Sequence, residues 1–300
     1  MNLDLRTLAF VASITSLILF LWMWGISVSR KSYPGFHHWT ISAFLFFVAM
    51  ELISLRGIID DAFTIVVANT SFILAFAMID HGLRIFTGSK PTWWFYGITA
   101  GLLAALFFYY TFIDPEVSLR IVVVSLLVVL YCVRLAWHVH RKLGSVLKEK
   151  NVLLLTVFAC LALWDLTRSV FTLIYEPNIK DFMTSGLFQS MTLLVFNCGT
   201  ILIYAGLVVA NAQRLELELK AALEDVRTLT GFLPMCANCK SVRDVSGYWN
   251  EIEQYLQIHT TAVTTHSICP NCAQKLYPEL FEKAAESIRT KNDKGDQIAG

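Results

Sequence analysis

The sequence predicts an all-α membrane protein: a seven-helix transmembrane bundle, then a helical connector, then a small α+β module at the C-terminus. Three observations predict it. Residues 1–211 hold seven long apolar stretches, residues 212–230 are polar with a heptad pattern, and the remainder carries four closely paired cysteines. Across the chain 56% of residues are hydrophobic and 16% charged, against about 45–50% and about 25% in soluble domains.

The apolar stretches have the length of membrane spans. A hydrocarbon core of about 30 Å requires about 20 apolar residues per helix. Helices are expected because spanning strands would alternate apolar and polar residues instead of running continuously apolar. The first stretch is longer than the apolar core of a signal peptide, so it is taken as a span. The predicted spans are 5–29, 36–56, 62–86, 92–113, 117–140, 151–175 and 185–211.

The loops between the spans predict an orientation. One set of loops is rich in lysine and arginine, and cytoplasmic loops carry that excess. The other set carries Arg56, Lys180 and several acids. We therefore expect a multi-pass protein of the cell inner (cytoplasmic) membrane, embedded in its lipid bilayer, with the N-terminus outside and the C-terminal module in the cytosol. The basic loops hold Arg30, Lys31, Arg84, Lys90, Arg141, Lys142, Lys148 and Lys150.

Five polar residues fall in the outer parts of the spans. Ionisable groups are costly in a membrane, so they are candidates for function. Asp165 and Arg168 are three residues apart and share a helix face. The five side chains either line one outward-facing ligand pocket or form an ion-pair network that holds the bundle together. They are Glu51, Arg56, Asn69, Asp165 and Arg168.

A second polar set lies near the predicted cytosolic ends of the spans. Long polar side chains there commonly reach out to the lipid head groups, and this is the role expected for most of the set. Its members are Asp80, His81, Arg84, Arg134, His138 and His140.

Residues 212–230 predict a helical connector. Leu215, Leu219, Ala222, Val226 and Leu229 recur at alternating steps of four and three, the a/d pattern of a coiled coil. Two readings fit this pattern. The connector either forms a parallel coiled coil in a homodimer, or packs as an amphipathic helix on its own bundle or on the lipid surface.

The C-terminal module, residues 231–285, contains two CxxC pairs. Each pair presents two thiolates, and two pairs complete the four-sulfur shell of a tetrahedral zinc ion. Thiols stay reduced in the cytosol, which favours a metal over disulfides. Zn²⁺ is the expected cofactor, with iron or redox chemistry as the alternative, and residues 286–300 are expected to be a disordered tail. The predicted ligands are Cys236, Cys239, Cys269 and Cys272, with His266 as an alternative ligand or as a hydrogen-bond partner of a ligand.

The module also has local structure signals. Asp244 to Gly247 predicts a turn, and Trp249, Ile252, Tyr255 and Leu256 recur at helical spacing, which predicts a helix over residues 248–259. Residues 260–268 are rich in threonine and predict a short strand.

Three strings in this region resemble a tail found on many bacterial signalling proteins. They are residues 229–244 (LTGFLPMCANCKSVRD), 247–255 (GYWNEIEQY) and 265–272 (THSICPNC). In that family the tail follows PAS, GAF or receiver domains, usually after a helical linker. The family more often has glycine where this chain has Ser267. The resemblance covers about residues 225–280 and implies a signalling role and a bacterial source, without an assigned activity.

Together these features predict a membrane-embedded sensor. The bundle detects a stimulus, the connector relays it, and the zinc module contacts a cytosolic signalling protein. All outer loops are short, so the stimulus must act within the bundle, through the lipid or on a shallow outer cavity. The alternatives are a transporter or channel with a regulatory tail, and a membrane enzyme, although no catalytic motif is present.

Two function classes are excluded by the sequence. The first is a rhodopsin-type photoreceptor. No lysine lies in the core of a predicted span, so retinal has no residue with which to form a Schiff base. The net charge is +1 and the last 70 residues hold seven Lys/Arg against eight Asp/Glu. A nucleic-acid-binding protein would carry a basic patch or tail, so no nucleic-acid partner is expected.

Overall fold

Close contacts divide the chain in the computed structural model into two compact units, Met1–Ala222 and Leu223–Gly300. The first unit holds the apolar helices and the second holds the paired cysteines. The predicted tail at 286–300, the end of the predicted module, Lys150 and Lys180 lie outside the described residues. The structure describes residues 4–149, 151–177, 179, 182–184, 186–231, 234–244, 247–259 and 265–280.

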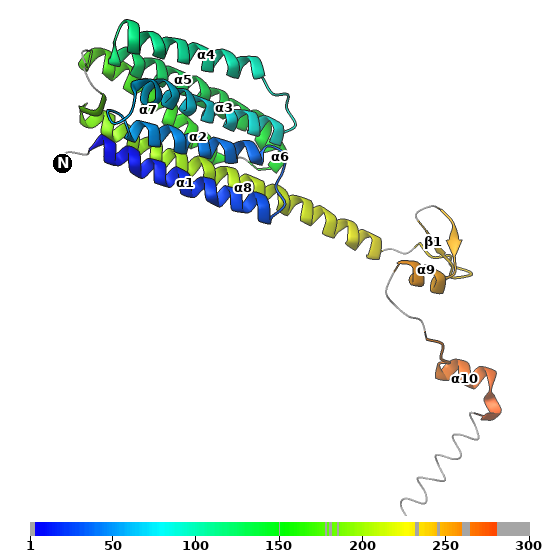
Figure 1. Ribbon diagram of the computed structural model, residues 1–300. Helices are drawn as coiled ribbons and strands as arrows, with labels where there is room; N and C mark the ends of the chain where they lie inside the picture. Colours follow the sequence, from blue (N-terminus) through cyan, green and yellow to red (C-terminus); the bar gives the residue numbers. More distant parts are fainter. Residues whose placement is uncertain are drawn as a thin grey trace, which may run out of the picture. The chain divides into compact units, whose positions relative to one another are not determined.

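Seven helices are long and apolar enough to cross a membrane, which confirms the predicted number of spans (Figure 1). Three of them include a π-helical turn, and the last continues past the ends of the others. The elements are α1 (Leu5–Ser29), α2 (Phe36–Ser54), η1 (Ala62–Val67) leading into α3 (Ala68–Phe86), α4 (Trp93–Phe108) leading into η2 (Tyr109–Ile113), α5 (Val117–His138) leading into η3 (Val139–Leu143) and α6 (Gly144–Leu147), α7 (Val152–Tyr175) and α8 (Leu187–Gly231).

Two span boundaries differ from the prediction. The fifth span continues to Leu147 instead of ending at residue 140, because polar residues extend the helix through η3 and α6 until Lys148 takes a left-handed conformation with φ of 57°. The second span ends at Ser54, so Arg56 lies in a turn that Gly57 completes at φ of 78°. Both differences arise because hydropathy marks where a helix leaves the apolar core, and the helix itself can end elsewhere.

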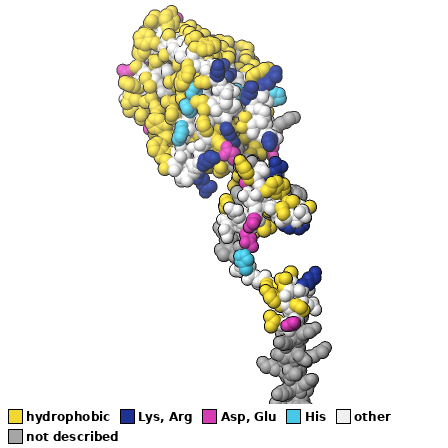
Figure 2. All heavy atoms as spheres, turned by 90° about the vertical axis from the view of Figure 1, so that its right-hand side faces the viewer, with side chains coloured by type: hydrophobic (Ala, Val, Ile, Leu, Met, Phe, Trp, Pro, Cys, Tyr) yellow, Lys and Arg dark blue, Asp and Glu magenta, His cyan; other side chains and the backbone are white. Residues whose placement is uncertain are grey.

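The outer surface of the bundle is apolar. Ile18, Trp93 and Leu163 are 61%, 61% and 67% exposed, and Figure 2 shows hydrophobic side chains over much of the bundle. Soluble monomers rarely expose apolar patches of this extent. The surface is therefore suited to lipid, and the chain is a multi-pass membrane protein.

The interior joins α8 to α2 and α3 through aromatic and hydroxyl contacts. Ser42 on α2 donates to the carbonyl of Ala75 on α3 at 2.8 Å, and its hydroxyl lies 2.7 Å from the Tyr204 hydroxyl on α8. Phe72 on α3 meets Phe196 on α8 edge-on, with ring centroids 5.3 Å apart. Helix α8 therefore packs against both α2 and α3, and a movement of α8 would change these contacts.

Two glycines allow α2 and α3 to approach closely. A side chain on Gly82 would put a carbon 2.6 Å from the Trp39 ring and 2.7 Å from the Gly35 carbonyl oxygen. Gly35 itself has φ of 105°, a conformation that other residues rarely adopt. The start of α2 thus lies directly against the end of α3.

The two ends of the bundle differ in charge. The end where α1, α3 and α5 finish, here called the basic end, exposes Arg30, Lys31, Lys90, Arg141, Lys142 and Lys148. Figure 2 looks onto this end and shows lysine and arginine side chains gathered there. The opposite end, here called the acidic end, carries Asp4, Asp60, Asp61, Asp114, Glu116 and Glu176.

The second unit is small. Strand β1 (Val242–Arg243) pairs antiparallel with β2 (Trp249–Asn250), and α9 (Ile252–His259) and α10 (Pro270–Leu276) follow. The turn predicted after Asp244 is present, because the Gly247 amide donates to the Asp244 carbonyl at 3.0 Å. The predicted helix begins at Ile252 rather than 248, since Trp249 pairs in β2. Residues 265–268 form no strand, and the rest of the predicted strand lies outside the described residues.

Candidate functional site

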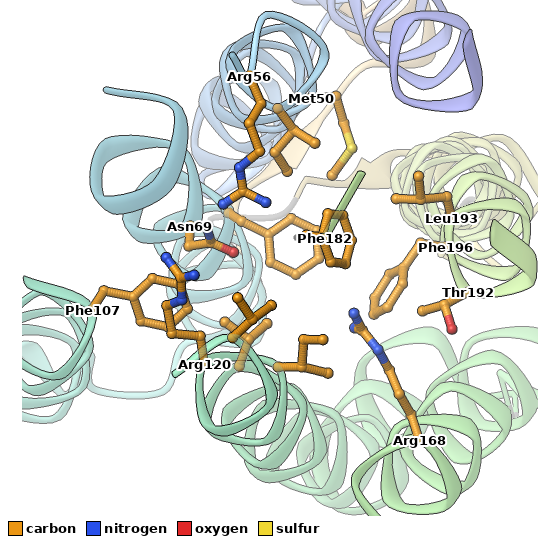
Figure 3. Close-up of a pocket in the computed structure, with 15 residues that line it drawn as sticks. Met50, Arg56, Asn69, Phe107, Arg120, Arg168, Phe182, Thr192, Leu193 and Phe196 are labelled. Atoms are coloured by element: carbon orange, nitrogen blue, oxygen red, sulfur yellow. The ribbon is translucent and has the colours of Figure 1, made fainter. Parts of the chain in front are cut away.

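A cavity lies between the spans towards the acidic end of the bundle (Figure 3). Its walls come from α2, α3, α4, α5, α7 and α8, and the short 3₁₀ turn η4 (Phe182–Thr184) contributes Phe182. Ten of its 15 lining side chains are aliphatic, aromatic or methionine. The other five are Arg56, Asn69, Arg120, Arg168 and Thr192. The cavity therefore combines apolar walls with three positive charges.

The three arginines reach the cavity from different parts of the fold. Figure 3 shows Arg56, Arg120 and Arg168 around one space, with Phe182 near its centre. The Arg56 guanidinium lies over the Phe182 ring, 5.4 Å from its centroid. Arg120 donates from Nη1 to the hydroxyl of Thr111 at 3.1 Å. These contacts hold the Arg56 and Arg120 side chains against the cavity walls.

A second, wider space, here called the vestibule, adjoins the cavity and shares lining residues with it. The centres of water-sized molecules could occupy about 70 Å³ of the cavity and about 330 Å³ of the vestibule. A single water needs about 10–15 Å³ on this measure. The cavity therefore holds several waters or a small group, and a larger ligand would extend into the vestibule. Arg56, Val117, Arg120 and Phe182 line both spaces.

The structure brings together three of the five residues predicted for an outer pocket. Arg56, Asn69 and Arg168 line the cavity. Glu51 instead accepts a hydrogen bond from Ser13 at 2.7 Å, between α2 and α1. The fifth residue, Asp165, is fully buried behind the wall. Three of the five residues thus line one cavity and the other two make contacts inside the bundle, while ligand binding at the cavity stays a prediction.

Asp165 and Arg168 form a long ion pair. Their closest atoms, Oδ1 and Nη1, are 3.9 Å apart, and neither Asp165 oxygen has a hydrogen bond among the described residues. Arg168 donates from Nε to the side-chain oxygen of Gln189 at 3.0 Å. Gln189 in turn donates to Glu176 at 3.0 Å. Arg168 is therefore positioned mainly by α8, through Gln189.

Twelve of the 15 lining residues were not selected from the sequence, and Arg120, Phe107 and Phe182 are among them. Arg120 lies three residues into the predicted fifth span, so the same rule that selected Arg168 could have found it. Phe107 and Phe182 carry no signal in the sequence, because aromatic residues are common in spans and loops. Only the packing of the helices shows which of them face the cavity.

A second polar cluster lies near the basic end. Oδ2 of the fully buried Asp80 accepts hydrogen bonds from Arg84, Arg134 and Tyr96 at 2.9, 2.9 and 2.6 Å. These residues come from α3, α4 and α5, so Asp80 ties three spans together. Its other oxygen, Oδ1, has no hydrogen bond among the described residues.

This cluster corrects the expectation for the second polar set. The side chains of Arg84 and Arg134 turn inward to Asp80 instead of reaching the head groups. His81 and His138 are 1% and 5% exposed. The prediction was wrong for the two arginines because Asp80 pairs with both of them inside the bundle. It was wrong for the two histidines because His138 lies 2.7 Å from the Thr87 hydroxyl and His81 packs against the Trp93 ring at 4.2 Å. His140 is exposed, as expected.

The four paired cysteines lie in the second unit. The Cys239 sulfur is 3.3 Å from the Ser241 hydroxyl, and hydrogen bonding with Ser241 lowers the pKa of Cys239 to about 7. The pKa of Cys269 is also lowered, chiefly by hydrogen bonds with Cys272. In the described part of the chain no three His, Cys, Asp or Glu side chains gather into a metal site. A backbone hydrogen bond closes the turn at each pair, from the Lys240 amide to the Cys236 carbonyl and from the Cys272 amide to the Cys269 carbonyl, both at 3.0 Å.

His266 has a carboxylate partner in this unit. Its Nε2 lies 3.3 Å from Oε1 of Glu253 on α9. A carboxylate on one ring nitrogen is the arrangement that orients a histidine whose other nitrogen binds a metal. The predicted role of His266, as a metal ligand or as a hydrogen-bond partner of one, stays a prediction.

Comparison with known protein families, with curated proteins and with solved structures finds no significant match to this chain.

Proposed function

We propose that the protein is a membrane-embedded signal transducer. In this proposal the acidic end faces outward from the inner (cytoplasmic) membrane, and a stimulus acts at the cavity there. Helix α8 relays the change through the membrane. A zinc-holding cysteine module in the cytosol then contacts a signalling protein.

The observation that carries the proposal is the path of α8. This helix contributes Thr192, Leu193 and Phe196 to the cavity wall. It then runs without interruption to Gly231, where the cysteine module begins. No proline or glycine weakens it between Gly206 and its last residue, Gly231. One hydrogen-bonded rod therefore joins the candidate input to the candidate output.

Contacts at the basic end grip α8 where it leaves the bundle. The side chain of Asn211 accepts from the Tyr33 amide at 3.2 Å, and the Arg214 guanidinium lies 4.4 Å from the Tyr33 ring centroid. Lys31 and Glu218 form an ion pair at 2.8 Å. The turn between α1 and α2 would thus hold α8 in one of its positions, and a shift of the helix would have to break or remake these contacts.

The donor set of the module suits a structural zinc ion. Cys236, Cys239, Cys269 and Cys272 supply four thiolates, which match tetrahedral zinc without an open position for catalysis. Metal and fold form together in small modules of this kind, and zinc would supply the cross-link between the two CxxC turns. The resemblance to tails of bacterial signalling proteins supports a role in contacting a partner.

The connector supports a homodimer in this proposal. Leu219, one of the a/d positions of the predicted pattern, is 60% exposed on the part of α8 that extends past the other spans. Leucines at a and d positions bury themselves against the same residues of a second copy. Anchoring in one membrane raises the effective concentration of the two connectors.

The relay can be tested on the full-length protein in lipid nanodiscs. A bulky substitution in the cavity, Thr192→Trp, should change hydrogen exchange in residues 212–280. The same substitution combined with Ala221→Pro, which breaks α8 below the bundle, should leave residues 231–280 as in the wild type. Phe44→Trp is the control, because Phe44 is exposed on the apolar surface away from the cavity lining.

Two results would count against the relay. One is an unchanged exchange pattern beyond residue 212 in a Thr192→Trp protein whose bundle is visibly perturbed. The other is transmission that survives the proline. Passage of solutes through proteoliposomes carrying the protein would favour the transporter alternative instead.

A further inference from the structure

We propose that His38 and His81 form a proton site near the basic end of the bundle, and that the pair holds a single proton while helices α2 and α3 stay in contact. This inference concerns the regulation of the proposed transducer, because the pair lies beside the contacts that grip α8. It rests on that function only for the effect on α8, and not for the uptake of the proton.

The two histidine rings lie directly against each other. His38 is in the first turn of α2, and His81 is in the last part of α3. Their ring centroids are 4.5 Å apart, with an angle of 53° between the planes. His81 is only 1% exposed, whereas His38 is half-buried. Protons can therefore reach the pair through His38, although His81 itself is enclosed.

The buried nitrogen of each ring has no hydrogen bond. Nδ1 of His38 and Nδ1 of His81 both lack a partner among the described residues. Histidine is the side chain whose charge ordinarily changes between about pH 5 and 8. The pair can therefore gain a proton without breaking a hydrogen bond at either of these atoms.

The surroundings can stabilise one positive charge on the pair. The Trp93 ring at the start of α4 lies against the His81 ring, with centroids 4.2 Å apart. A cation close to the face of an indole ring is attracted by its π electrons. The neutral imidazole of His38 adds a nitrogen that can accept a hydrogen bond. One charged ring would thus be held by an aromatic ring and by the second imidazole.

A second proton would be opposed by repulsion. Two charged imidazole rings 4.5 Å apart disfavour each other's charge. Asp80 does not compensate for a second charge, because it already pairs with Arg84 and Arg134, two positive groups against one negative. Asp80 is the one acid among the ionisable groups around the pair, which are Tyr33, His37, Asp80, Arg84, Tyr96, Arg134, His138 and Arg214.

The pair lies at the closest contact between α2 and α3. A side chain on Gly82, the residue after His81, would come within 2.7 Å of the Gly35 carbonyl oxygen. Two charged rings could therefore separate only by opening this contact. An unfolded chain binds both protons below about pH 6, whereas the closed pair binds one. Because the unfolded chain binds more protons, the stability of the closed bundle falls as the pH falls.

An opening at this contact would reach α8 through aromatic rings. Trp39, the residue after His38, lies 5.2 Å from Phe86 between ring centroids, and Tyr33 lies 6.1 Å from the same ring. The Arg214 guanidinium of α8 is 5.0 Å from the Phe86 centroid and 4.4 Å from that of Tyr33. Charging both histidines would thus loosen the grip on α8 by a route separate from the cavity.

Proton uptake is measured on the full-length chain in lipid nanodiscs, with the histidine ring nitrogens labelled for NMR. The chain has seven histidines, and His38→Phe and His81→Phe identify the two signals while keeping an aromatic ring in place. From about pH 8 to 5, the two wild-type rings should together gain one proton. The remaining ring of each single variant should complete its own change. His140→Gln, at an exposed position on η3, is the control and should leave both signals as in the wild type.

Thermal unfolding gives a second readout. Between about pH 7.5 and 5, the midpoint of the wild type should fall at least about 4 °C further than that of the double variant His38→Phe/His81→Phe. If His81→Phe fails to fold, His38→Phe, at the half-buried position, takes the place of the double variant. Equal falls in midpoint would contradict the opening between α2 and α3.

The proposal is overturned if both wild-type rings become charged independently, as in the single variants, or if neither ring responds over this range. Its failure is distinct from failure of the relay. Uptake of one proton with unchanged hydrogen exchange in residues 211–223 at low pH would contradict only the link to α8. A pH response of these residues in a protein whose Thr192→Trp variant transmits nothing would contradict only the relay from the cavity.

Discussion

Asp80 is the residue at which three spans of the bundle meet, and its removal should be costly. Asp80→Asn leaves the Arg84 and Arg134 guanidinium groups, which are 16% and 21% exposed, without their negative partner. Breaking a buried ion pair from one side costs about 3–5 kcal/mol. Thermal unfolding in detergent should show a large drop in midpoint. Asp114→Asn, on the exposed acidic end, is the matched control and should change stability by less than about 0.5 kcal/mol.

Tyr33 should make the stability of the bundle sensitive to alkaline pH. Burial, followed by the nearby Glu218 carboxylate, raises the pKa of Tyr33 to about 12. An unfolded tyrosine titrates near about 10, so the folded state holds this proton more tightly. The resulting stabilisation is complete below pH 10 and is lost as the pH rises from 10 through 12. The free energy of unfolding of wild type minus that of Tyr33→Phe should therefore fall across this window. A difference that stays constant from pH 9 to 12 would contradict the assignment.

At the scale of single residues, the sequence shows which residues are polar but not which way their side chains point in the bundle. Arg56, Asn69 and Arg168 could be selected because polar groups are rare in spans, and they line the cavity. Glu51 was selected by the same rule, yet it faces Ser13 on α1. Which face of a helix meets which neighbour depends on its rotation in the bundle. Two polar residues on one span therefore cannot be assigned to a pocket or to a helix contact from hydropathy alone.

At the scale of elements, the spans were predictable and their contacts were not. Length and apolar character determine that a segment crosses the membrane, so all seven spans were found. The close approach of α2 and α3 depends instead on single glycines. The sequence shows Gly97 and Gly101 at the spacing of a packing motif, but a side chain at either position would meet nothing within 4 Å. Gly35 and Gly82, which lie far apart in the sequence, are the ones in contact.

The glycine contact gives a paired test. Gly82→Ala should destabilise the bundle by about 1–3 kcal/mol, because the added carbon would overlap the Trp39 ring and the Gly35 carbonyl oxygen. Gly97→Ala places the same carbon in open space and should leave stability unchanged or raise it, since alanine favours helix. Both are measured as thermal midpoints in the same detergent. Equal midpoints for the two variants would show that α2 and α3 are less closely packed.

The connector gives a test of the proposed homodimer. Leu219→Cys should form a disulfide between two copies in membranes. In a parallel coiled coil, the same a or d residue of the two helices lies face to face. Ala221→Cys is the control, since two residues turn a helix by about 200° and put this position on the far face. Mass spectrometry of the linked peptides separates these disulfides from those of native cysteines. Equal linking at both positions, or none at Leu219, would favour a connector that packs on its own bundle or on lipid.

At the scale of the whole molecule, the order of the parts is the main argument for function. A bundle with an arginine-lined cavity, an uninterrupted helix and a small cysteine module follow one another in 300 residues. Each part alone is compatible with transport or with structure. Their sequence matters because α8 belongs to all three: it lines the cavity, leaves the bundle past Tyr33, and ends at the module. A signal transducer requires such a shared element, whereas a transporter does not need its last span to continue.

The cysteine module has little hydrophobic core of its own. Its described residues include two short strands and two short helices, with Ile252 and Ile268 38% and 56% exposed. So little core rarely supports a fold without a metal or a similar cross-link. We therefore expect the purified full-length chain to carry about one zinc ion per chain by elemental analysis.

Zinc loss should be local in its effect. Cys236→Ser combined with Cys239→Ser should remove the metal and make residues 231–280 sensitive to protease, while the thermal midpoint of the bundle stays that of the wild type. Cys160→Ser combined with Cys198→Ser is the control, because these two exposed thiols lie on spans α7 and α8. It should keep both the zinc and the protected module. A wild-type chain that contains no zinc and still protects residues 231–280 would refute the metal site, and iron in its place would support the alternative metal. A change in the bundle midpoint on zinc loss would instead mean that the module stabilises the membrane unit, which an output at the end of a relay does not require.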